Sequence, residues 1–429
     1  MINETVILLT PLEDCSKHRL SEHLGQPLVL TSPFDLYWYK PLQKVFSKVI
    51  AYDYPKRQTE IGVRAVNKEV IELVRKELPK YVLWLSAYYE FRESTFECIR
   101  REGAIVIGSF MDDEICFDDC SKWWIPYLDY CLTNAIEAVP KYRELGARVI
   151  LTVPVGGGIP MDRDWSNIEE RHEVSFVGLK EADREQYINV LRNRNIPVHV
   201  FGKGWGGRVP YEEMRDIFKT SKINLNFSRT HHDNKLGIKG RVFEVCLAGG
   251  FLLMEYVPSI ENYFVLDKEI VCFKNAEEMI DKVIYYLNHD KQRRDIAQAG
   301  WKRAINEYTP FHMLSKVFRE IEEDMAARGR ENSLSPFPRK LKVPMPVRKR
   351  FSQYYFNWGN AFSQENYKGL WKDAFSLSIV YNPFNIRAWL YYIVGFLPYF
   401  ARRALIRLYK AVKKSLSLGR HSIADKSRV

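Results

Sequence analysis

A glycine-rich stretch at residues 198–207, VHVFGKGWGG, has the residue types and spacing of a nucleotide-binding turn. An apolar run leads into Gly202, Gly204 and Gly207, which satisfy the G-x-G-x-x-G pattern of dinucleotide-binding proteins. In such a turn the third glycine opens a helix whose N-terminus faces the pyrophosphate, and a carboxylate about 20 residues later binds the ribose. Taken alone, this pattern indicates an oxidoreductase.

Two features of the neighbouring sequence disfavour that interpretation. Pro210 lies where the helix should begin and pushes the residue before it out of helical geometry. The next predicted strand, at residues 222–228, has no carboxylate at its end. An NAD- or FAD-dependent oxidoreductase is therefore the weaker alternative. The turn is still expected to bring its backbone, and the ring of Trp205, close to a ligand.

A cluster of acidic residues, Asp112-Asp113-Glu114, follows a predicted strand and has two possible chemistries. Clustered carboxylates can hold a divalent cation against a diphosphate. A carboxylate in a cleft can instead bind or deprotonate an acceptor hydroxyl. We expect Asp112 or Asp113 in the second role and no essential metal, because helix starts with cationic residues can take the phosphate. Simple solvation of a loop is the alternative.

The elements that must position these residues are short apolar strands alternating with helices. Strands are predicted at residues 6–9, 81–86, 104–109, 127–133 and 149–153, with helices at 67–77 and 134–145. After residue 173 further strands are predicted at 174–177, 198–201, 223–227, 251–254 and 270–273, with helices at 184–194, 211–220, 241–247 and 276–288. Such alternation predicts parallel sheets with helices on both faces.

A glycine- and proline-rich stretch at residues 154–160 divides the two series and is typical of a hinge. We therefore predict an α/β protein with two doubly wound, Rossmann-like domains, residues 1–160 and 161–327. Their ligand site is expected in the cleft at the carboxyl ends of the strands. Because both domains would be complete by residue 327, a chain ending there is expected to stay soluble and bind its ligand.

The net charge is concentrated at the end of the chain. The whole chain carries +11, but residues 339–429 contain 18 Lys and Arg against three acidic residues, which gives +15 and leaves −4 for residues 1–338. Residues 401–416 combine basic and apolar helical turns, the pattern of a helix in a membrane interface. We predict that residues 328–429 form a linker and a basic helical tail on an anionic membrane surface. A helix packed on the body is the alternative.

Other features of the composition bear on compartment and partners. Seven cysteines without a disulfide-framework spacing favour reduced thiols in a cytosol. The first residues lack the basic and apolar regions of a signal peptide, and no apolar run is long enough to span a bilayer. We expect a cytoplasmic protein at the inner membrane face. No nucleic acid is expected as a partner, because no recognisable module is present.

The most specific signal is KINLNFSRTHHDNKLGIKGRVFEVCLAGGFLLMEY, residues 222–256. It resembles the C-terminal domain of group-1 glycosyltransferases, in particular the CgeB-like branch, with R-x-F-E-x-x-x-x-G-G at a helix start. The resemblance covers residues 80–325 and is strongest over 175–310. It implies the GT-B fold and transfer of a sugar from a nucleotide-sugar donor to a glycan or lipid-linked acceptor, as in polysaccharide biosynthesis.

The resemblance and the chemistry of a nucleotide sugar give a candidate donor site. Gly240 and Arg241 open a helix whose free N–H groups and dipole favour phosphate, and the guanidinium can bind phosphate oxygens in pairs. The resemblance assigns Glu244 to the ribose hydroxyls. Arg241, Asp112 and Asp113 are the candidate catalytic residues. The other expected donor contacts lie in turns and at strand ends: Gly178, Lys180, Arg184, Gly202, Lys203, Gly204, Trp205, Asn226, Ser228 and Lys239.

Leu236 departs from the family pattern. Retaining members have two glutamates eight residues apart, and Leu236 takes the position of the first. The stereochemical outcome is therefore open, and a non-catalytic scaffold that binds sugars or nucleotides on the same fold remains an alternative.

Overall fold

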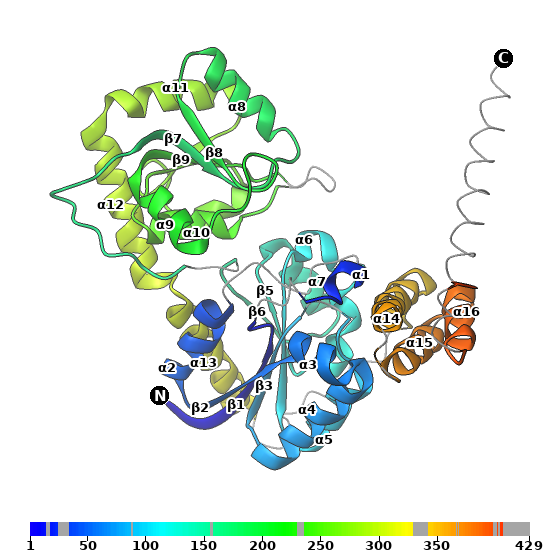
Figure 1. The fold of residues 1–429 in the computed structure, drawn as a ribbon. Coiled ribbons are helices and arrows are strands. Elements are labelled where there is room, and N and C mark those ends of the chain that lie inside the picture. Colours follow the sequence, from blue (N-terminus) through cyan, green and yellow to red (C-terminus); the bar gives the residue numbers. More distant parts are fainter. Residues whose placement is uncertain are drawn as a thin grey trace, which may run out of the picture.

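The computed structural model describes residues 1–13, 18–24, 34–86, 89–154, 158–229, 236–328, 342–365, 367, 369–397, 401 and 404–405. Within these residues the chain forms two α/β domains, each around one parallel sheet, and a layer of C-terminal helices beside the first domain (Figure 1). The predicted fold class, with two Rossmann-like domains, is confirmed.

The first domain has a six-stranded sheet in the order β2-β1-β3-β4-β5-β6. The strands are β1 (Ile2–Thr10), β2 (Phe46–Asp53), β3 (Tyr81–Leu85), β4 (Ile105–Phe110), β5 (Tyr130–Thr133) and β6 (Val149–Leu151), and all pairs are parallel. The central strands are buried along nearly their whole length, as their continuous apolar runs require. The strand β2 is not predicted from the sequence, because this edge strand is only partly buried and has no such run.

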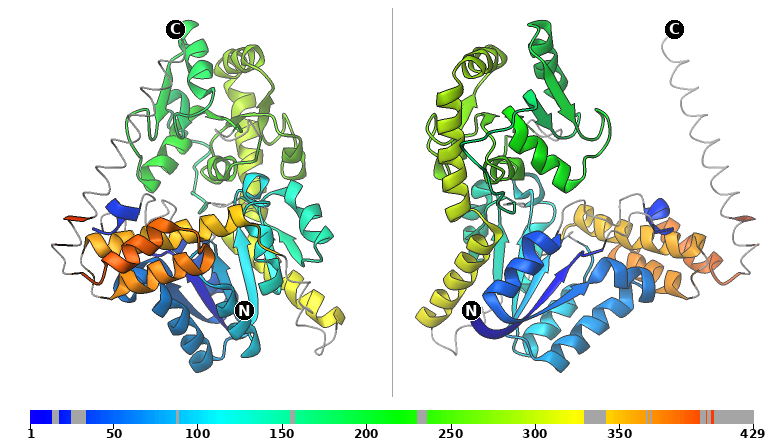
Figure 2. Two further views of the ribbon diagram at one scale, coloured as in Figure 1. Left: turned by 90° about the vertical axis from the view of Figure 1, so that its right-hand side faces the viewer. Right: turned by 60° about the vertical axis from the view of Figure 1, so that its left-hand side comes forward.

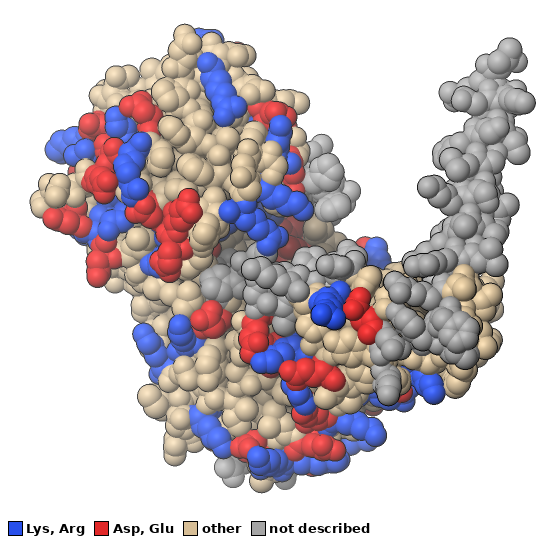
Figure 3. Space-filling model, viewed as in Figure 1, with Lys and Arg blue, Asp and Glu red and all other residues tan. Residues whose placement is uncertain are grey.

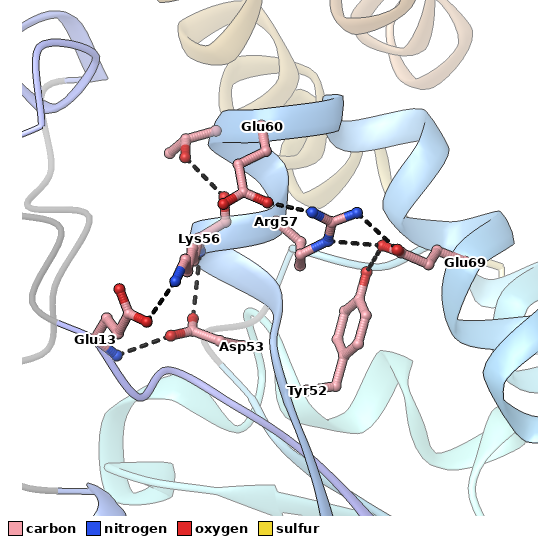
Figure 4. Close-up of polar contacts among 8 residues, drawn as sticks. Glu13, Tyr52, Asp53, Lys56, Arg57, Glu60 and Glu69 are labelled. Atoms are coloured by element: carbon pink, nitrogen blue, oxygen red, sulfur yellow. Dashed lines mark hydrogen bonds and ion pairs between the residues drawn. The ribbon is translucent and has the colours of Figure 1, made fainter. Parts of the chain in front are cut away.

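Helices on both faces of this sheet complete the first domain. They are α1 (Ser21–Leu24), the π-helical turn η1 (Asp35–Tyr39), α2 (Lys40–Val45), α3 (Tyr54–Ile61), α4 (Val63–Glu77), α5 (Glu93–Arg101), α6 (Asp113–Cys116) and α7 (Val139–Glu144). Polar contacts fasten the ends of β1 and β2 to α3 and α4 (Figure 4). Asp53 accepts hydrogen bonds from the backbone N–H of Glu13 at 2.8 Å and of Lys56 at 3.3 Å, while Arg57 pairs with Glu69 at 2.7 Å.

The second domain has a five-stranded sheet in the order β11-β10-β9-β7-β8. Its strands are β7 (His172–Val177), β8 (Val198–Phe201), β9 (Ser221–Asn226), β10 (Leu252–Glu255) and β11 (Val271–Phe273). Its helices are α8 (Arg184–Asn193), α9 (Tyr211–Thr220), α10 (Gly240–Leu247), α11 (Ala276–Asn288) and α12 (Asp290–Glu307). The strand order reverses between β7 and β9, so a crevice opens at their carboxyl ends.

The helix α13 (Pro310–Arg328) carries the chain back to the first domain (Figure 1). Its apolar face packs on the first sheet, and the ring of Phe318 lies 4.6 Å from that of Phe46. The hydroxyl of Tyr130 donates to Asp324 at 2.7 Å. The predicted domain boundary at residue 327 is therefore corrected, because the apolar stripe of α13 is buried against the first sheet and not against the second domain.

The helices α14 (Met345–Gln364), α15 (Leu370–Tyr381) and α16 (Ile386–Val394) form a layer against the first domain, as both views of Figure 2 show. The aromatic side chains of α14, among them Phe351, Tyr355 and Trp358, belong to the same buried core as Trp84 of β3. The hydroxyl of Tyr381 donates to Glu93 at 2.6 Å.

The prediction of a separate tail is therefore wrong for residues 345–394. The aromatic stripe of α14 outweighs the excess of positive charge, because a stripe of that kind is stable only when it is buried. The predicted interfacial helix 401–416 lies outside the described residues, apart from residues 401, 404 and 405. Among the helices described, none has the length and apolar character needed to cross a membrane. Lys and Arg alternate with Asp and Glu over both domains on the face seen in Figure 3.

Candidate active site

A cavity of about 250 Å³ lies at the carboxyl ends of β7 and β9, where the strand order reverses. Its lining residues come from both domains: Tyr37, Phe176, Val177, Gly178, Leu179, Arg184, Asn226, Phe227, Lys239, Gly240, Arg241 and Glu244. The structure thus brings together many of the predicted donor contacts around one space: Gly178, Arg184, Asn226, Lys239, Gly240, Arg241 and Glu244.

The N-terminus of α10 forms one wall of this cavity. Lys239 precedes the helix in an extended conformation, and no side chain in the described part of the chain caps the first turn. The first N–H groups of a helix have no partner within the helix, and the helix dipole adds partial positive charge there. With Lys239 and Arg241 beside it, this end of α10 is suited to an anion.

Glu244, one turn into α10, already makes two contacts with the protein. Its side chain is buried, Oε1 accepts a hydrogen bond from the hydroxyl of Tyr37 at 2.7 Å, and Oε2 pairs with the guanidinium of Arg241. Burial lowers the pKa of Arg241, but the carboxylate of Glu244 more than compensates, so the net pKa of Arg241 is raised. The Arg241 side chain still keeps 37% of its surface exposed, and it is a permanent cation at the cavity.

Tyr37 brings the first domain into the site. It belongs to η1, and its ring stands edge-on to that of Tyr211 in the second domain, with the centroids 5.8 Å apart. Burial, reinforced by the Glu244 carboxylate, raises the pKa of Tyr37, so the hydroxyl stays protonated and donates. The sequence analysis did not predict this residue, because an aromatic run without a motif gives no signal that it faces a cleft.

Arg184 and Asn226 line the cavity, and each has a buried donor atom without a partner among the described residues. Arg184 donates to the carbonyl oxygens of Leu179 at 3.0 Å and Arg229 at 3.1 Å, but its Nε finds no acceptor in the described structure. Asn226 ends β9 with 4% of its surface exposed, and its Nδ2 is likewise unpaired among the described residues. Since buried donors in native proteins are nearly always paired, such atoms at a cavity point to an acceptor on a ligand.

The glycine-rich turn does not line this cavity. Gly202 has a φ of +121°, and a Cβ there would lie 2.2 Å from the carbonyl oxygen of Gly178. A Cβ at Gly204 would lie 2.6 Å from Cβ of Lys180, whose N–H donates to the carbonyl of Lys203 at 2.9 Å. The turn after β8 therefore packs on the turn after β7. Gly202, Lys203 and Gly204 are thus not among the residues that line the cavity, and their ligand contacts stay a prediction.

Three further predicted donor contacts also lie away from the cavity lining. The ammonium of Lys180 pairs with Glu185 at 2.6 Å and lies 5.2 Å from the ring centroid of Trp205. Ser228 is fully buried, and its hydroxyl donates to the carbonyl of Glu255 at 3.0 Å. Lys180, Trp205 and Ser228 thus support the turns and strand ends around the site.

The two predicted catalytic acids differ in their surroundings. Asp113 is buried and accepts hydrogen bonds from the hydroxyls of Ser121, Thr133 at 2.7 Å and Tyr142 at 2.9 Å. Burial raises the pKa of Asp113 to about 6. The expected catalytic role of Asp113 is therefore corrected, because its carboxylate is enclosed in the first domain.

Asp112 stays exposed at the carboxyl end of β4, in the left-handed conformation with a φ of 55°. Desolvation by the surrounding protein and the Glu114 carboxylate raise the pKa of Asp112. The ammonium of Lys239 offsets part of this effect, and the net pKa is above its ordinary value. Glu114 lies 3.4 Å from the ammonium of Lys239, so the two domains face each other here with opposite charges.

Metal-ligating side chains do not gather at this site. Over the described ranges, no three side chains of His, Cys, Asp and Glu lie close enough together to hold one metal ion. The paired histidines at 231 and 232 fall outside those ranges.

Comparison with known proteins shows similarity to glycosyltransferases. Residues 184–319 match the family model described as glycosyl transferase-like. Spore protein CgeB of Bacillus subtilis (strain 168) is 21% identical over 232 residues, which cover 48% of this chain and 72% of that protein. Residues 184–319 are therefore glycosyl transferase-like, and the chain is similar to CgeB. The predictions of this family and of a glycosyltransferase as the enzyme class are confirmed.

Solved structures resemble this glycosyltransferase at low sequence identity. A glycosyltransferase from Rickettsia africae ESF-5 is 10% identical, with 75% of this chain and 98% of that chain covered and a TM-score of 0.47. Anabaena Alr3699/HepE in complex with UDP and glucose is 6% identical, with 75% and 100% covered and a TM-score of 0.48. TarM is 8% identical with a TM-score of 0.43, and the match spans 59% of this chain and little more than half, 58%, of TarM.

Proposed function

We propose that this glycosyltransferase uses a nucleotide sugar as its donor and transfers the sugar to a glycan or lipid-linked acceptor. The observation that carries the proposal is the set of positive and donor groups around one cavity. Lys239, Arg241 and the N-terminus of α10 provide positive charge, and Arg184 and Asn226 provide unpaired donors. A diphosphate, with its negative charge and many acceptor oxygens, suits this combination.

In the proposed reaction the acceptor hydroxyl forms a bond to the anomeric carbon, and the bond from that carbon to the diphosphate oxygen breaks. Negative charge grows on the departing diphosphate, so Arg241 and the end of α10 stabilise the transition state more than the bound donor. The hydroxyl proton must pass to a base, and Asp112 is the candidate because it is exposed at the facing edge of the first domain.

Glu244 remains the proposed partner of the ribose. Its two oxygens contact Tyr37 and Arg241, and each carboxylate oxygen can accept more than one hydrogen bond. Ribose hydroxyls would therefore share the carboxylate or replace the hydroxyl of Tyr37. In either arrangement the binding of the donor depends on the Glu244 carboxylate. We therefore expect Glu244→Gln to weaken donor binding by about 1–3 kcal/mol.

The donor is tested by titrating the full chain with UDP-, GDP- and ADP-sugars, and with NAD and FAD as controls, in thermal-shift and calorimetric measurements. We expect binding of a nucleotide sugar and none of the dinucleotides. Binding of NAD or FAD alone would support the oxidoreductase that the glycine pattern first indicated and would contradict the proposal.

No divalent cation is needed in this proposal, because protein cations lie where the diphosphate would bind. Sugar transfer should therefore continue in EDTA. A complete loss of activity that Mn²⁺ or Mg²⁺ restores would contradict the assignment of Arg241 and Lys239 to the leaving group.

The non-catalytic scaffold stays the second candidate because of Leu236. Its side chain is 36% exposed, it pairs with Arg229 in an isolated bridge, and it does not line the cavity. A bound nucleotide sugar that is neither transferred nor hydrolysed over long incubation would favour the scaffold.

We also propose that the enzyme works at the cytoplasmic face of a membrane, held peripherally. The support is the positive charge of residues 339–429, which contain 18 Lys and Arg and three acidic residues. Basic residues near an anionic leaflet contribute about 1 kcal/mol each and are screened by salt. Sedimentation with anionic vesicles at low salt, and release at about 1 M salt, would be the expected result.

A further inference from the structure

The helix α16 is apolar on two opposite sides. Ala388, Tyr391 and Val394 face inward, with 0%, 3% and 9% of their surfaces exposed. The other side carries a stripe at helical spacing that is open to solvent: Ile386 at 79%, Trp389 at 44%, Leu390 at 36% and Ile393 at 63%. A surface helix normally carries polar residues opposite its buried stripe, so the outer side of α16 needs an apolar partner.

The exposed stripe continues beyond both ends of the helix. Phe384, in the turn before α16, is 79% exposed, and Phe396 and Leu397 after it are 60% and 42% exposed. We define the α16 face as these exposed apolar residues: Phe384, Ile386, Trp389, Leu390, Ile393, Phe396 and Leu397. In Figure 1 α16 is the outermost labelled helix of its layer, on the side away from the first sheet.

The surroundings of the α16 face are positive. Between Asp373 and Asp425 the sequence has no acidic residue and eight basic ones, Arg387, Arg402, Arg403, Arg407, Lys410, Lys413, Lys414 and Arg420. Two cations flank the face itself. The ammonium of Lys372 lies 4.6 Å from the ring centroid of Phe396, and the guanidinium of Arg387 lies 4.6 Å from that of Phe356. Such side chains can lay their stems on apolar surface and keep the charge outside it.

We infer that the α16 face inserts into the headgroup region of an anionic lipid bilayer. Exposed aliphatic and aromatic side chains, flanking cations and the lack of acidic residues between Asp373 and Asp425 in the sequence together match an interfacial membrane surface. The inference rests on the proposed membrane location and makes it specific. Attachment occurs through a folded part of the first domain's helical layer, and the basic residues after 401 add attraction to it.

The test compares two variants of the full chain with three apolar-to-serine substitutions each. The α16 variant carries Phe384→Ser, Ile386→Ser and Ile393→Ser. The matched control carries substitutions at exposed apolar residues of other elements, Leu78→Ser, Val265→Ser and Ile284→Ser, which are 73%, 49% and 43% exposed. Binding to vesicles of phosphatidylglycerol and phosphatidylcholine is measured by co-sedimentation. Donor binding in solution and the molar mass from sedimentation equilibrium are measured in parallel.

We expect the wild type and the control variant to bind the vesicles alike, and the α16 variant to lose at least about tenfold in affinity. The fluorescence of Trp389 is obtained by subtracting the spectrum of Trp389→Phe from that of the wild type. Its emission should shift to shorter wavelength on binding to vesicles. Equal vesicle binding by both variants, or none by the wild type, would overturn the inference. A wild-type dimer that the α16 variant converts to a monomer would assign the face to a second copy and would also overturn it. Donor binding in solution reports on the proposed function separately, so failure of one proposal is distinguishable from failure of the other.

Discussion

The two domains treat the polar groups at the carboxyl ends of their strands in different ways. In the first domain the carboxylates of Asp53, Glu90 and Asp113 accept hydrogen bonds from the protein around them. In the second domain Arg184 and Asn226 place unpaired donors at a cavity. The first domain also leaves buried atoms unpaired at this edge, Oδ1 of Asn134 and Nε of Arg92, but neither residue lines the cavity.

This difference distinguishes polar residues that stabilise the fold from polar residues that are available to bind a ligand. A buried carboxylate with three hydroxyl partners is complete, and any substrate would have to displace those partners at a cost. A buried donor without a partner costs free energy until an acceptor arrives. The cavity of the second domain therefore suits a ligand rich in acceptors, such as the proposed diphosphate, whereas Asp53, Glu90 and Asp113 of the first domain are already paired within the protein.

The largest effect is expected from removing the helical layer. A chain that ends at Arg328 lacks α14–α16 and uncovers the core around Trp84. Each buried aromatic side chain of α14 contributes about 2–3 kcal/mol of burial, and together these contributions are comparable to the stability of an ordinary domain. The first domain should therefore unfold, contrary to the expectation from sequence. Circular dichroism and limited proteolysis measure this, with a chain ending at Leu405 as the control. A truncated chain that melts like the full chain would show that the layer is dispensable.

Arg241→Ala tests the catalytic side of the comparison. Turnover should fall about 10²–10³-fold, the typical cost of removing one group that stabilises developing negative charge, and donor affinity should change less. Initial rates and calorimetric titration of the donor measure the two effects. Lys180→Ala is the matched control, because Lys180 is a cation near the site that pairs with Glu185 and does not line the cavity. Equal and small effects of both variants would make Arg241 structural.

Asp113→Asn tests the structural side through pH. The raised pKa of about 6 means that folded Asp113 keeps its proton at a pH where the unfolded carboxyl, with its ordinary value of 3.8, has lost it. The folded state then binds more protons between about pH 4 and 6, so the free energy of unfolding falls as pH rises through this window, by about 3 kcal/mol in all. Denaturant unfolding at several pH values should show that this slope is smaller in Asp113→Asn than in the wild type. Lost activity with unchanged stability would return Asp113 to the catalytic site.

Much of the second domain could be predicted from sequence. The strand at 198–201 and the helices at 211–220 and 276–288 were predicted to the residue, because apolar runs and helical periodicity are local signals. Glu244 of α10 was found through the resemblance of residues 222–256 to group-1 glycosyltransferases, and Arg241 also through the chemistry of a cation at a helix start. Gly202 and Gly204 first indicated a dinucleotide-binding turn. Close packing of two turns requires the same glycines as close approach of a phosphate, so the pattern alone does not distinguish the two.

Long-range contacts explain most of the remaining errors. The sequence of α13 and α14 shows an apolar stripe but not which domain buries it. Asp113 and Asp112 are neighbours of the same type, and only the tertiary structure turns one inward and the other outward. Tyr37 reaches Glu244 from 207 residues away, a contact that no local pattern reports.

The smallest effect is expected from Asn226→Ala, and it sharpens the comparison most. The buried Nδ2 of Asn226 has no partner in the described structure, so its removal should change the free energy of unfolding by less than about 1 kcal/mol. If the amide binds the donor, affinity for the nucleotide sugar should still fall by about 1–2 kcal/mol. Ser228→Ala is the matched control at the same strand end, because its hydroxyl donates to Glu255 at 3.0 Å and does not line the cavity. That variant should lose about 1 kcal/mol of stability and keep its donor affinity. Donor affinity is measured by calorimetric titration and stability by chemical unfolding. If unpaired donors mark the ligand site, Asn226→Ala lowers mainly the donor affinity and Ser228→Ala mainly the stability. If they do not, both variants keep their donor affinity.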